Sequence, residues 1–395
     1  MASDLVGGRV DTKHCHFIDS AMANSLRKGF ARTGDVLLSH KATLGRTALL
    51  GPISSEFVVL TPQVTYYRVL KPDVLYPPFL KYYFDSQPFQ DLLTAWSGGG
   101  STRAYIGITE QLKFPILLPP ISDQREIADC LSAFDAKIEI ERKLMATLES
   151  IIRAIFSAWF IEFDQVPASL ERPDSKGACV AATSSPLASI EERPIPRGWR
   201  VGRLGDVSVN ERRGISYASI LDHTPYIGLE HMPRRSIALT RWDNAMGLES
   251  NKSQFRRGEI LFGKLRPYFH KVGIAPVSGV CSTDILVVRG ISDEWSSFVL
   301  GHLISDALIA HTDRCSTGTK MPRASWDHIA DFKVVIPTRD AARELHEIVS
   351  PISERIISGV HASREAASLR DLLLPKLLSG ELPMIEANSL LRKSA

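Results

Sequence analysis

The sequence predicts an α+β protein that is built twice from one plan, with two α/β domains separated by two long antiparallel helices. Three observations predict it: an internal repeat, short β-branched and aromatic runs in each half, and a heptad pattern that closes each half. The 395 residues suit two or three domains. With 44% hydrophobic and 23% charged residues, the composition is that of a globular protein and excludes wholesale disorder.

The repeat consists of three motifs that recur in the same order at a nearly constant offset along the chain. The pairs are GDVLL at 34–38 with GEILF at 258–262, GSTR at 100–103 with GTKM at 318–321, and FPILLP at 114–119 with FKVVIP at 332–337. A long helical pattern follows each last motif. The shared order and the steady offset favour a pseudo-symmetric molecule over chance similarity.

The globular part of each half is expected to form a small sheet with short helices. Runs rich in β-branched and aromatic residues, bounded by Gly and Pro, predict the strands. The expected strands are 36–38, 57–60, 66–70 and 114–119 in the first half, and 260–262, 271–275, 285–288 and 332–337 in the second. The expected short helices are 78–86 and 295–310.

Two long helices are the strongest structural prediction. Apolar residues with a heptad spacing predict the first from Ser122 to Phe160, which is about 58 Å at 1.5 Å per residue. They are Ile127, Leu131, Phe134, Ile138, Met145, Leu148, Ile152, Ile155 and Trp159, with Glu141 in the one broken position. The second helix is expected from near Asp340 to Gly380, with the apolar positions Leu345, Val349, Ile352, Ile356, Ala366 and Leu373.

These helices are expected to pack antiparallel as a spacer, with one domain held near each end. The alternative is that each helix folds back on its own domain. The predicted boundaries are a first domain at 1–120, a helix at 121–162, a linker at 163–197, a second domain at 198–338, a helix at 339–382 and a tail at 383–395. The linker prediction rests on a stretch rich in Pro, Ser and Ala that has no periodicity.

No catalytic set stands out in the sequence. It has no Walker loop, G-x-S-x-G, H-E-x-x-H or Rossmann glycine motif, and its five cysteines are far apart and form no metal-ligand cluster. The Tyr76–Phe79 segment (YPPF) is interpreted as a structural turn. No signal peptide and no apolar run of about 18 residues is recognised, so a cytoplasmic protein that does not enter a membrane is expected.

Basic residues gather beside aromatic and small polar ones at matching points of both halves. The candidate DNA-binding residues are Lys41, Thr43, Arg46, Arg103 and Tyr105 in the first half, and Lys264, Arg266, Tyr268, Lys271, Lys320 and Arg323 in the second. Lys and Arg neutralise phosphates, and Arg also pairs with guanine in the major groove. A single basic run is usually a solvated surface, and the net charge of +3 is weak. The prediction of DNA binding therefore rests on the occurrence of basic groups at equivalent positions in both halves.

Four segments resemble the specificity subunits of type I restriction-modification enzymes. They are LPPISDQREI at 118–127, WFIEFD at 159–164, IPRGWRVGRLGD at 195–206 and LRDLLLPKLLSGEL at 369–382. The resemblance implies two target-recognition domains that each read half of a bipartite site in double-stranded DNA, with the helices fixing their separation.

The same resemblance implies a non-catalytic subunit without a cofactor of its own. Two methyltransferase subunits would carry S-adenosylmethionine and methylate adenine, and two restriction and translocation subunits would use ATP and Mg. One rival is a stand-alone methyltransferase, which S-adenosylmethionine binding by the isolated chain would reveal. The other is a coiled-coil adaptor or a truncated silent allele, which would bind methyltransferase subunits without protecting specific DNA.

The two halves differ at their openings. In the second half, the segment 199–257, which starts with Trp199, precedes Gly258, whereas in the first half only the segment 1–33 precedes Gly34. The first recognition domain is therefore expected to be shortened by about 26 residues, which corresponds to a strand or two, or else its true start lies upstream.

Overall fold

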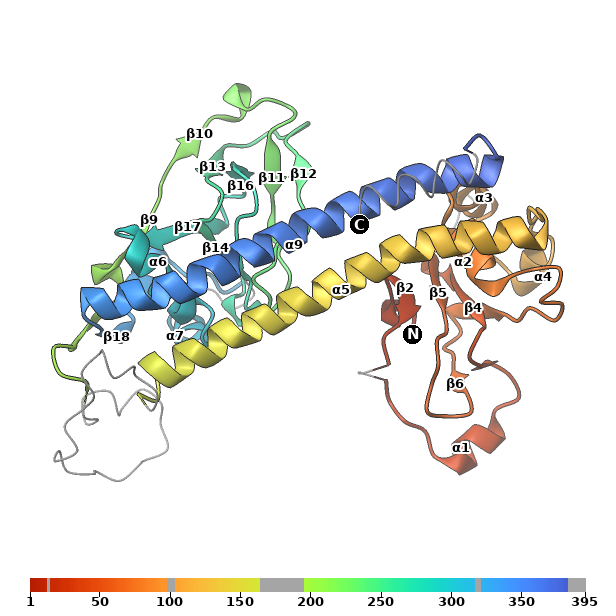
Figure 1. The fold of residues 1–395 in the computed structure, drawn as a ribbon, viewed down its shortest axis with the longest axis horizontal. Helices are drawn as coiled ribbons and strands as arrows, with labels where there is room; N and C mark the ends of the chain where they lie inside the picture. The colour runs from red at the N-terminus through yellow and green to blue at the C-terminus, as the bar shows by residue number, and fades with distance from the viewer. Residues whose placement is uncertain (13–14, 98–103, 164–194, 317–320, 383–395) are drawn as a thin grey trace. The chain divides into compact units, whose positions relative to one another are not determined.

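The computed structural model describes residues 1–12, 15–97, 104–163, 195–316 and 321–382. Most of the predicted linker, the predicted tail beyond residue 382, and the candidates Arg103 and Lys320 lie outside the described residues. The chain divides into two compact units. Unit 1 contains Met1–Ile138 and Glu365–Ala395, and unit 2 contains Glu139–Arg364, so each unit includes part of both long helices (Figure 1).

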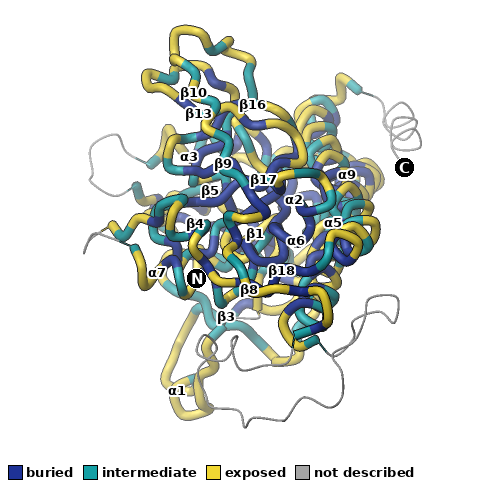
Figure 2. The backbone as a smooth tube through the Cα atoms, turned by 90° about the vertical axis from the view of Figure 1, so that its left-hand side faces the viewer, coloured by how far each residue is buried: buried dark blue, intermediate teal, exposed yellow. Residues whose placement is uncertain are grey.

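Unit 1 is built on a five-stranded sheet with the order β1-β2-β5-β4-β7. Its strands are β1 Leu5–Val6, β2 Gly8–Val10, β4 Val36–Lys41, β5 Thr43–Leu49 and β7 Val64–Tyr67, and a separate pair is formed by β3 Phe30–Ala31 and β6 Val58–Val59. The helices are α1 Ser20–Ser25, α2 Pro77–Asp85, α3 Gln87–Trp96 and α4 Ile108–Gln111. Helices α2 and α3 bury Leu80, Phe84 and Phe89 in one cluster with Val36 and Leu38 of β4. Strand β4 is buried along most of its length, whereas Figure 2 shows the exposed course of α1.

Unit 2 contains two sheets and a strand pair. The sheet orders are β15-β14-β17-β9, β10-β13-β16-β11-β12 and β18-β8. The strands are β8 Arg200–Arg203, β9 Ser208–Asn210, β10 Gly214–Ile215, β11 Pro225–Ile227, β12 Asp243–Asn244, β13 Lys252–Phe255, β14 Ile260–Gly263, β15 Val272–Ile274, β16 Gly279–Cys281, β17 Ile285–Gly290 and β18 Lys333–Ile336. The helices are α6 Asp293–Leu303, α7 Asp306–Cys315 and α8 Trp326–Ala330.

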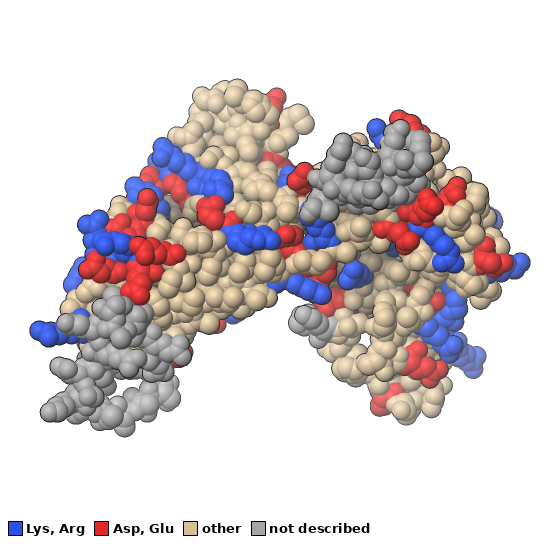
Figure 3. Space-filling view, viewed as in Figure 1, with Lys and Arg blue, Asp and Glu red and all other residues tan. Residues whose placement is uncertain are grey.

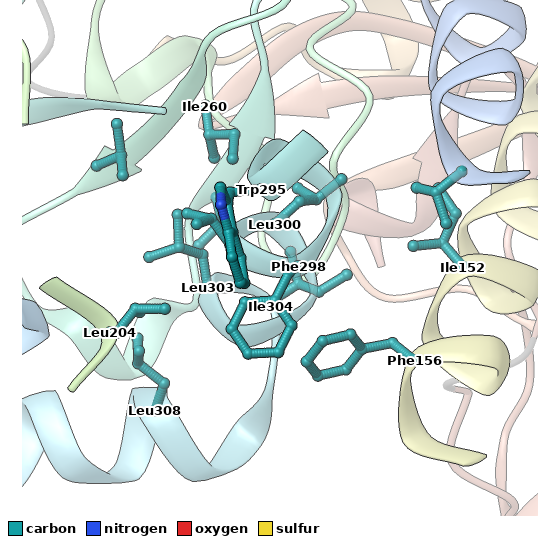
Figure 4. Packing of buried hydrophobic residues seen from close by; sticks show 14 of the residues in the cluster. Ile152, Phe156, Leu204, Ile260, Trp295, Phe298, Leu300, Leu303, Ile304 and Leu308 are labelled. Carbon is teal, nitrogen blue, oxygen red and sulfur yellow. The ribbon is translucent and has the colours of Figure 1, made fainter. Parts of the chain in front are cut away.

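The core of unit 2 is rich in aromatic side chains. Phe298 on α6 is fully buried, and its ring lies 5.3 Å from that of Phe160 and 6.1 Å from that of Phe156. Figure 4 shows Phe156 pointing from its long helix toward Phe298, with Leu204 and Leu308 closing the other side. The end of the first long helix is therefore part of this core, because two of its phenylalanines fill it.

The long helices are α5 Ile121–Phe160 and α9 Arg339–Ser379, close to the expected ranges. They run antiparallel and pack on each other in both units. In unit 1, Asp135 accepts a hydrogen bond from Arg370, and in unit 2, Glu141 forms an ion pair of 2.9 Å with Arg355. The predicted fold class is confirmed, and the alternative in which each helix folds back on its own domain is wrong.

The heptad positions of α5 face the interior. Ile127, Leu131 and Phe134 are buried in unit 1, and Met145 and Ile152 are buried in unit 2. Glu141 occupies the broken heptad position because its carboxylate forms an ion pair with the guanidinium of Arg355 on α9.

The repeat is visible in individual backbone hydrogen bonds. The N–H of Arg32 donates to the carboxylate of Asp35 at 2.8 Å, and the N–H of Arg256 donates to that of Glu259 at 2.7 Å. Between each pair lies a glycine with positive φ, Gly34 at 92° and Gly258 at 87°. The same turn, in which an acidic side chain accepts from the backbone N–H three residues before it, therefore precedes an inner strand of the sheet in each unit, β4 or β14.

One expected strand is absent. Residues 114–119 form no helix and pair as a strand with no other described segment, whereas the equivalent β18 pairs with β8. The strand needs a partner to form its ladder, and the described residues of unit 1 include no counterpart of β8. One backbone carbonyl of this segment is instead satisfied by a side chain, since the Tyr83 hydroxyl donates a hydrogen bond to the carbonyl of Pro115.

Two other expected elements have different bounds. The helix predicted at 295–310 is two helices, because the Ser305 hydroxyl donates to the carbonyl of His302 and accepts from the N–H of Leu308, which ends α6 and caps α7. The strand predicted at 66–70 ends at Tyr67, where the Arg68 side chain turns to Asp35. The YPPF segment is not a free turn either: its prolines begin α2.

Candidate nucleic-acid interface

In unit 1 the predicted basic residues lie beside a bridged turn at the end of β4. Ala42, with φ of 67°, connects β4 and β5. Its N–H donates to the carbonyl of Ala104 at 3.0 Å, and the N–H of Ile106 donates to the carbonyl of His40 at 3.0 Å. These bonds hold the segment that follows the glycine-rich loop against the hairpin.

Unit 2 has the same bridge at the end of β14. The N–H of Arg266 donates to the carbonyl of Pro322 at 2.8 Å, and the N–H of Ala324 donates to the carbonyl of Lys264 at 3.0 Å. The backbone of Arg266 has a left-handed conformation, with φ of 52°, as does that of its counterpart Ala42. The donors and acceptors match those of unit 1 one for one at the offsets of the sequence repeat, so the two bridges are copies.

The bridge brings three of the unit 1 candidates together. Lys41 forms an isolated β-bridge with Tyr105, and its ammonium lies 5.8 Å from the centre of the Tyr105 ring. Lys41, Thr43 and Tyr105 are exposed. Arg46 is also exposed, but its guanidinium donates to the carbonyl of Ala2. A cation, a hydroxyl and an aromatic ring on one turn can contact a phosphate and stack on a base or sugar.

In unit 2 the bridge gathers Lys264, Arg266 and Arg323. Arg323 is exposed and pairs with Asp284 at 3.0 Å, and it bridges to Leu265. Burial lowers the pKa of Lys264 below its usual value; Asp284 opposes this shift and Arg323 adds to it. Three cationic side chains and one carboxylate therefore share this turn.

The other two candidates of unit 2 lie nearby. Tyr268 is exposed and its ring packs edge-on against Phe269 at 4.7 Å. Lys271 is half-buried, and its ammonium donates to the carbonyl of Leu229 at 2.5 Å. Lys271 is therefore held by its own domain, and its assignment to DNA stays a prediction.

Sequence reasoning missed an arginine pair in this part of unit 2. Arg234 and Arg235 are exposed, and the guanidinium of Arg234 lies 3.8 Å from the centre of the Phe269 ring. The N–H of Arg235 donates to the carbonyl of His270. The adjacent arginines after Pro233 were the available signal, but only the fold brings them to the 266–271 segment.

The charge pattern of the surface is mixed. On the face drawn in Figure 3, the described basic and acidic side chains are interspersed over both units. Binding to a polyanion would therefore depend on local groups, such as those at the bridged turns, more than on a broad positive field.

The described residues contain no group of three or more His, Cys, Asp or Glu side chains suited to a metal ion. Every helix in the described part of the chain is too short or too polar to span a bilayer.

Comparison with known proteins shows which proteins the chain resembles. A family model described as the type I restriction modification DNA specificity domain matches residues 28–150. The chain is 25% identical over 366 residues to the MjaIX specificity subunit of Methanocaldococcus jannaschii, covering 89% of this chain and 78% of that relative. The chain is thus similar to the specificity subunits of type I restriction-modification systems. Its function is DNA sequence recognition in such a system, as a recognition subunit and not a catalyst.

Other relatives extend the likeness over both units. The HindI specificity subunit of Haemophilus influenzae is 22% identical, covering 93% of this chain and 91% of that protein. Among solved structures, the S subunit from M. genitalium has a TM-score of 0.53 at 16% identity and covers 89% of this chain and 84% of that one. At this identity the structural likeness supports the fold of a specificity subunit.

Proposed function

We propose that this specificity subunit reads a bipartite DNA site, with one half contacted by each unit through its bridged turn. The observation that carries the proposal is the duplicated bridge. In both units it places cationic side chains at the end of an inner strand of the sheet, β4 or β14, and Lys41, Tyr105 and Arg323 among these bridge residues are exposed. Identical backbone with different side chains suits two modules that contact DNA in the same way and read different bases.

The side chains differ in a way that predicts different half-sites. The unit 1 bridge carries Lys41 and Tyr105, whereas the unit 2 bridge carries Arg266 and Arg323. Arg donates two parallel hydrogen bonds and matches guanine O6 and N7, while Lys and Tyr suit phosphate and stacking contacts. Unit 2 is therefore expected to read a guanine.

The catalysts and their cofactors are proposed to reside on other chains. Methyltransferase and restriction subunits would bind this subunit, two of each, and would supply S-adenosylmethionine, ATP and Mg. A cytoplasmic location follows from that partnership. The pseudo-symmetry of the repeat supports two methyltransferase subunits, because two equivalent units offer two equivalent docking surfaces.

The test maps methylated adenines in a host genome with and without this gene, and then with variants of unit 2. The variants are Arg266→Asn and Arg323→Gln, expressed with the methyltransferase subunits. Asn keeps the left-handed backbone of Arg266 accessible while it removes the charge. We expect each variant to relax one base of the methylated site, and the affinity of the purified complex for that site to fall about 5- to 150-fold, the equivalent of about 1–3 kcal/mol.

The control is Arg343→Ala, an exposed arginine at the start of α9 that pairs with Asp340 and lies outside the bridge. It should leave the methylated site unchanged. An unaltered site in both bridge variants would remove these arginines from recognition. Loss of methylation without any change in the sites that remain would instead indicate a purely structural adaptor.

A further inference from the structure

Two arginines of unit 2 share the ring of one phenylalanine. The guanidinium carbon of Arg234 lies 3.8 Å from the centre of the Phe269 ring, and that of Arg266 lies 5.8 Å from the same centre. The ring of Tyr268 packs edge-on against Phe269 at 4.7 Å. An arginine that lies over an aromatic face keeps the N–H groups at its edge available for a further partner. Phe269 therefore holds two cationic groups close together beside the bridged turn.

These two arginines have no acidic partner. Within the described residues, no carboxylate lies within ion-pair distance of Arg234 or Arg266, and Nε of Arg266 is buried without a hydrogen-bond partner. Arg323 on the same bridge differs, because it pairs with Asp284 at 3.0 Å. Two neighbouring guanidinium groups without a carboxylate favour the binding of an anion from outside the chain.

A third cation adds to this local charge. Burial lowers the pKa of Lys271, the charge of Arg234 lowers that pKa further, and Glu230 opposes both effects. Glu230 is exposed and forms no ion pair with Arg234 in the described part of the chain. Positive charge is therefore concentrated around Arg234 and only partly compensated.

The backbone around the two arginines is strained. Five non-glycine residues have positive φ in the described part of the chain, and three of them are Arg235 at 54°, Arg266 at 52° and His270 at 51°. The N–H of Arg235 donates to the carbonyl of His270 at 2.9 Å, and its guanidinium donates to Asp306 at 2.9 Å. Left-handed backbone at residues other than glycine is costly and gathers at functional sites. Here it surrounds the arginines that share the ring.

Unit 1 has apolar residues at the corresponding positions. Strand β15 pairs with β14 as β5 pairs with β4, and this register makes Phe269 the counterpart of Leu44. Arg266 is the counterpart of Ala42. The arrangement of a ring with a bridge arginine is therefore a feature of unit 2 and not of the shared plan.

We propose that Arg234, held against the Phe269 ring, binds the DNA phosphate next to the base pair that Arg266 contacts, and that Phe269 is a positioning residue for both arginines. This placement rests on the proposed function, in which Arg266 reads a base. One guanidinium donates two parallel hydrogen bonds to a phosphate, and such a contact fixes the register of a protein on the duplex without reading sequence. Unit 2 would then carry more of the salt dependence of DNA binding than unit 1.

The test measures the affinity of the complex between the full chain and its methyltransferase subunits for two fluorescein-labelled duplexes at several salt concentrations. One duplex contains the methylated site of the host genome, and the other has an unrelated sequence. We expect Arg234→Ala to weaken binding to both duplexes equally. The slope of log affinity against log salt should become less negative by about 0.9, because one phosphate contact is lost.

The control for this variant is Arg343→Ala, which removes an exposed charge outside the cluster and should keep the slope of the wild type. The methylated sequence itself should be the same in Arg234→Ala as in the wild type, because a phosphate contact carries no sequence information.

The role of the ring is tested by Phe269→Leu, which keeps an apolar side chain like that of Leu44 and removes the aromatic face. We expect the affinity for the site duplex to fall about 2- to 5-fold, and the ratio of affinities for the site and the unrelated duplex to fall as well. Phe269→Tyr should restore both quantities, because it restores the ring. A side chain that only filled space would be replaced by Leu without a change in this ratio.

Two results would overturn the proposal. The first is a salt slope of Arg234→Ala that equals those of the wild type and Arg343→Ala. The second is a Phe269→Leu complex with the affinity and the selectivity of the wild type. Failure of the proposed function is a separate result: an unchanged methylated site in Arg266→Asn would remove base reading by Arg266, whereas the slope of Arg234→Ala measures the phosphate contact whichever residue reads the base.

Discussion

At the scale of single residues, backbone conformation explains why the repeated motifs keep a glycine. Gly34 and Gly258 both have positive φ, and a Cβ added at either would meet no atom within 4 Å. The requirement for glycine is therefore conformational and does not come from packing, because L side chains disfavour this region of φ.

Gly258→Ala is expected to destabilise unit 2 by about 1–2 kcal/mol, the cost of placing an L side chain in the left-handed region. Chemical denaturation of the full chain measures it. Gly214→Ala is the control, since Gly214 also has open space but no positive φ, and its effect should stay within about 0.5–1 kcal/mol and favour folding. Equal effects of the two substitutions would contradict the conformational explanation.

His302 is the residue that most directly links pH to stability. It is fully buried among the rings of Phe156, Phe298 and Phe332, and neither ring nitrogen has a hydrogen-bond partner among the described residues. Burial lowers the pKa of His302 to about 3. Because its pKa in the unfolded chain is near 6.5, the unfolded state binds the extra proton between these values.

Folding stability should therefore fall as pH drops from about 6.5 toward 3, by up to about 1.4 kcal/mol per pH unit from this one group. His302→Phe should flatten the dependence over that window, and His223→Phe, at an exposed histidine, should not. Urea unfolding at several pH values measures both. A His302→Phe profile as steep as that of the wild type would show that other groups cause the loss.

At the scale of elements, the long helices combine an apolar seam with a few polar pairs. In unit 1 the seam ends at a buried network, in which Asp135 accepts hydrogen bonds from Lys81 at 3.2 Å, Tyr82 at 2.7 Å and Arg370. Burial alone would raise the pKa of Asp135, but Lys81, Tyr82 and Arg370 outweigh it and hold that pKa below its usual value. The polar groups fix the register of the two helices, while the apolar residues supply the stability.

Leu131→Ala is expected to cost about 2–5 kcal/mol, because Leu131 is fully buried between α5, α9 and α2. Ile140→Ala is the matched control on the same helix, with a side chain that is 63% exposed. Thermal unfolding followed by circular dichroism at 222 nm compares them. Similar losses in both variants would mean that α5 and α9 do not pack through the predicted heptad face.

At the scale of the whole molecule, each unit has its own core, and the two long helices contribute to both. The aromatic cluster around Phe298 includes α5 residues of unit 2, whereas the cluster of β4, α2 and α3 lies in unit 1. A substitution that destabilises one core should therefore first increase local unfolding of the strands in the same unit.

Phe298→Ala is expected to destabilise unit 2 by about 3–5 kcal/mol, because it empties the centre of the aromatic core. Amide hydrogen exchange should show faster exchange in β14 and β17, with less change in β4. Equal acceleration in β4 and β14 would show that the chain unfolds as a single cooperative body.

The sequence alone determined the repeat, both long helices and the resemblance to specificity subunits, because heptad spacing, glycine turns and short motifs are local patterns. It also located most of the bridge residues, since the offsets place Lys41 and Arg266 at equivalent turns. The arginine pair at 234–235 escaped it, because its approach to Phe269 joins distant segments.

Only the tertiary structure decided how similar motifs behave in different surroundings. FPILLP and FKVVIP look alike, yet only the second forms a strand, since β8 lies beside it and the first has no described partner. Glu141 interrupts the heptad pattern of the sequence, and only the fold places Arg355 opposite it as an ion-pair partner. A strand and a buried charge each need a partner that is remote in the sequence, and the fold alone determines whether that partner is there.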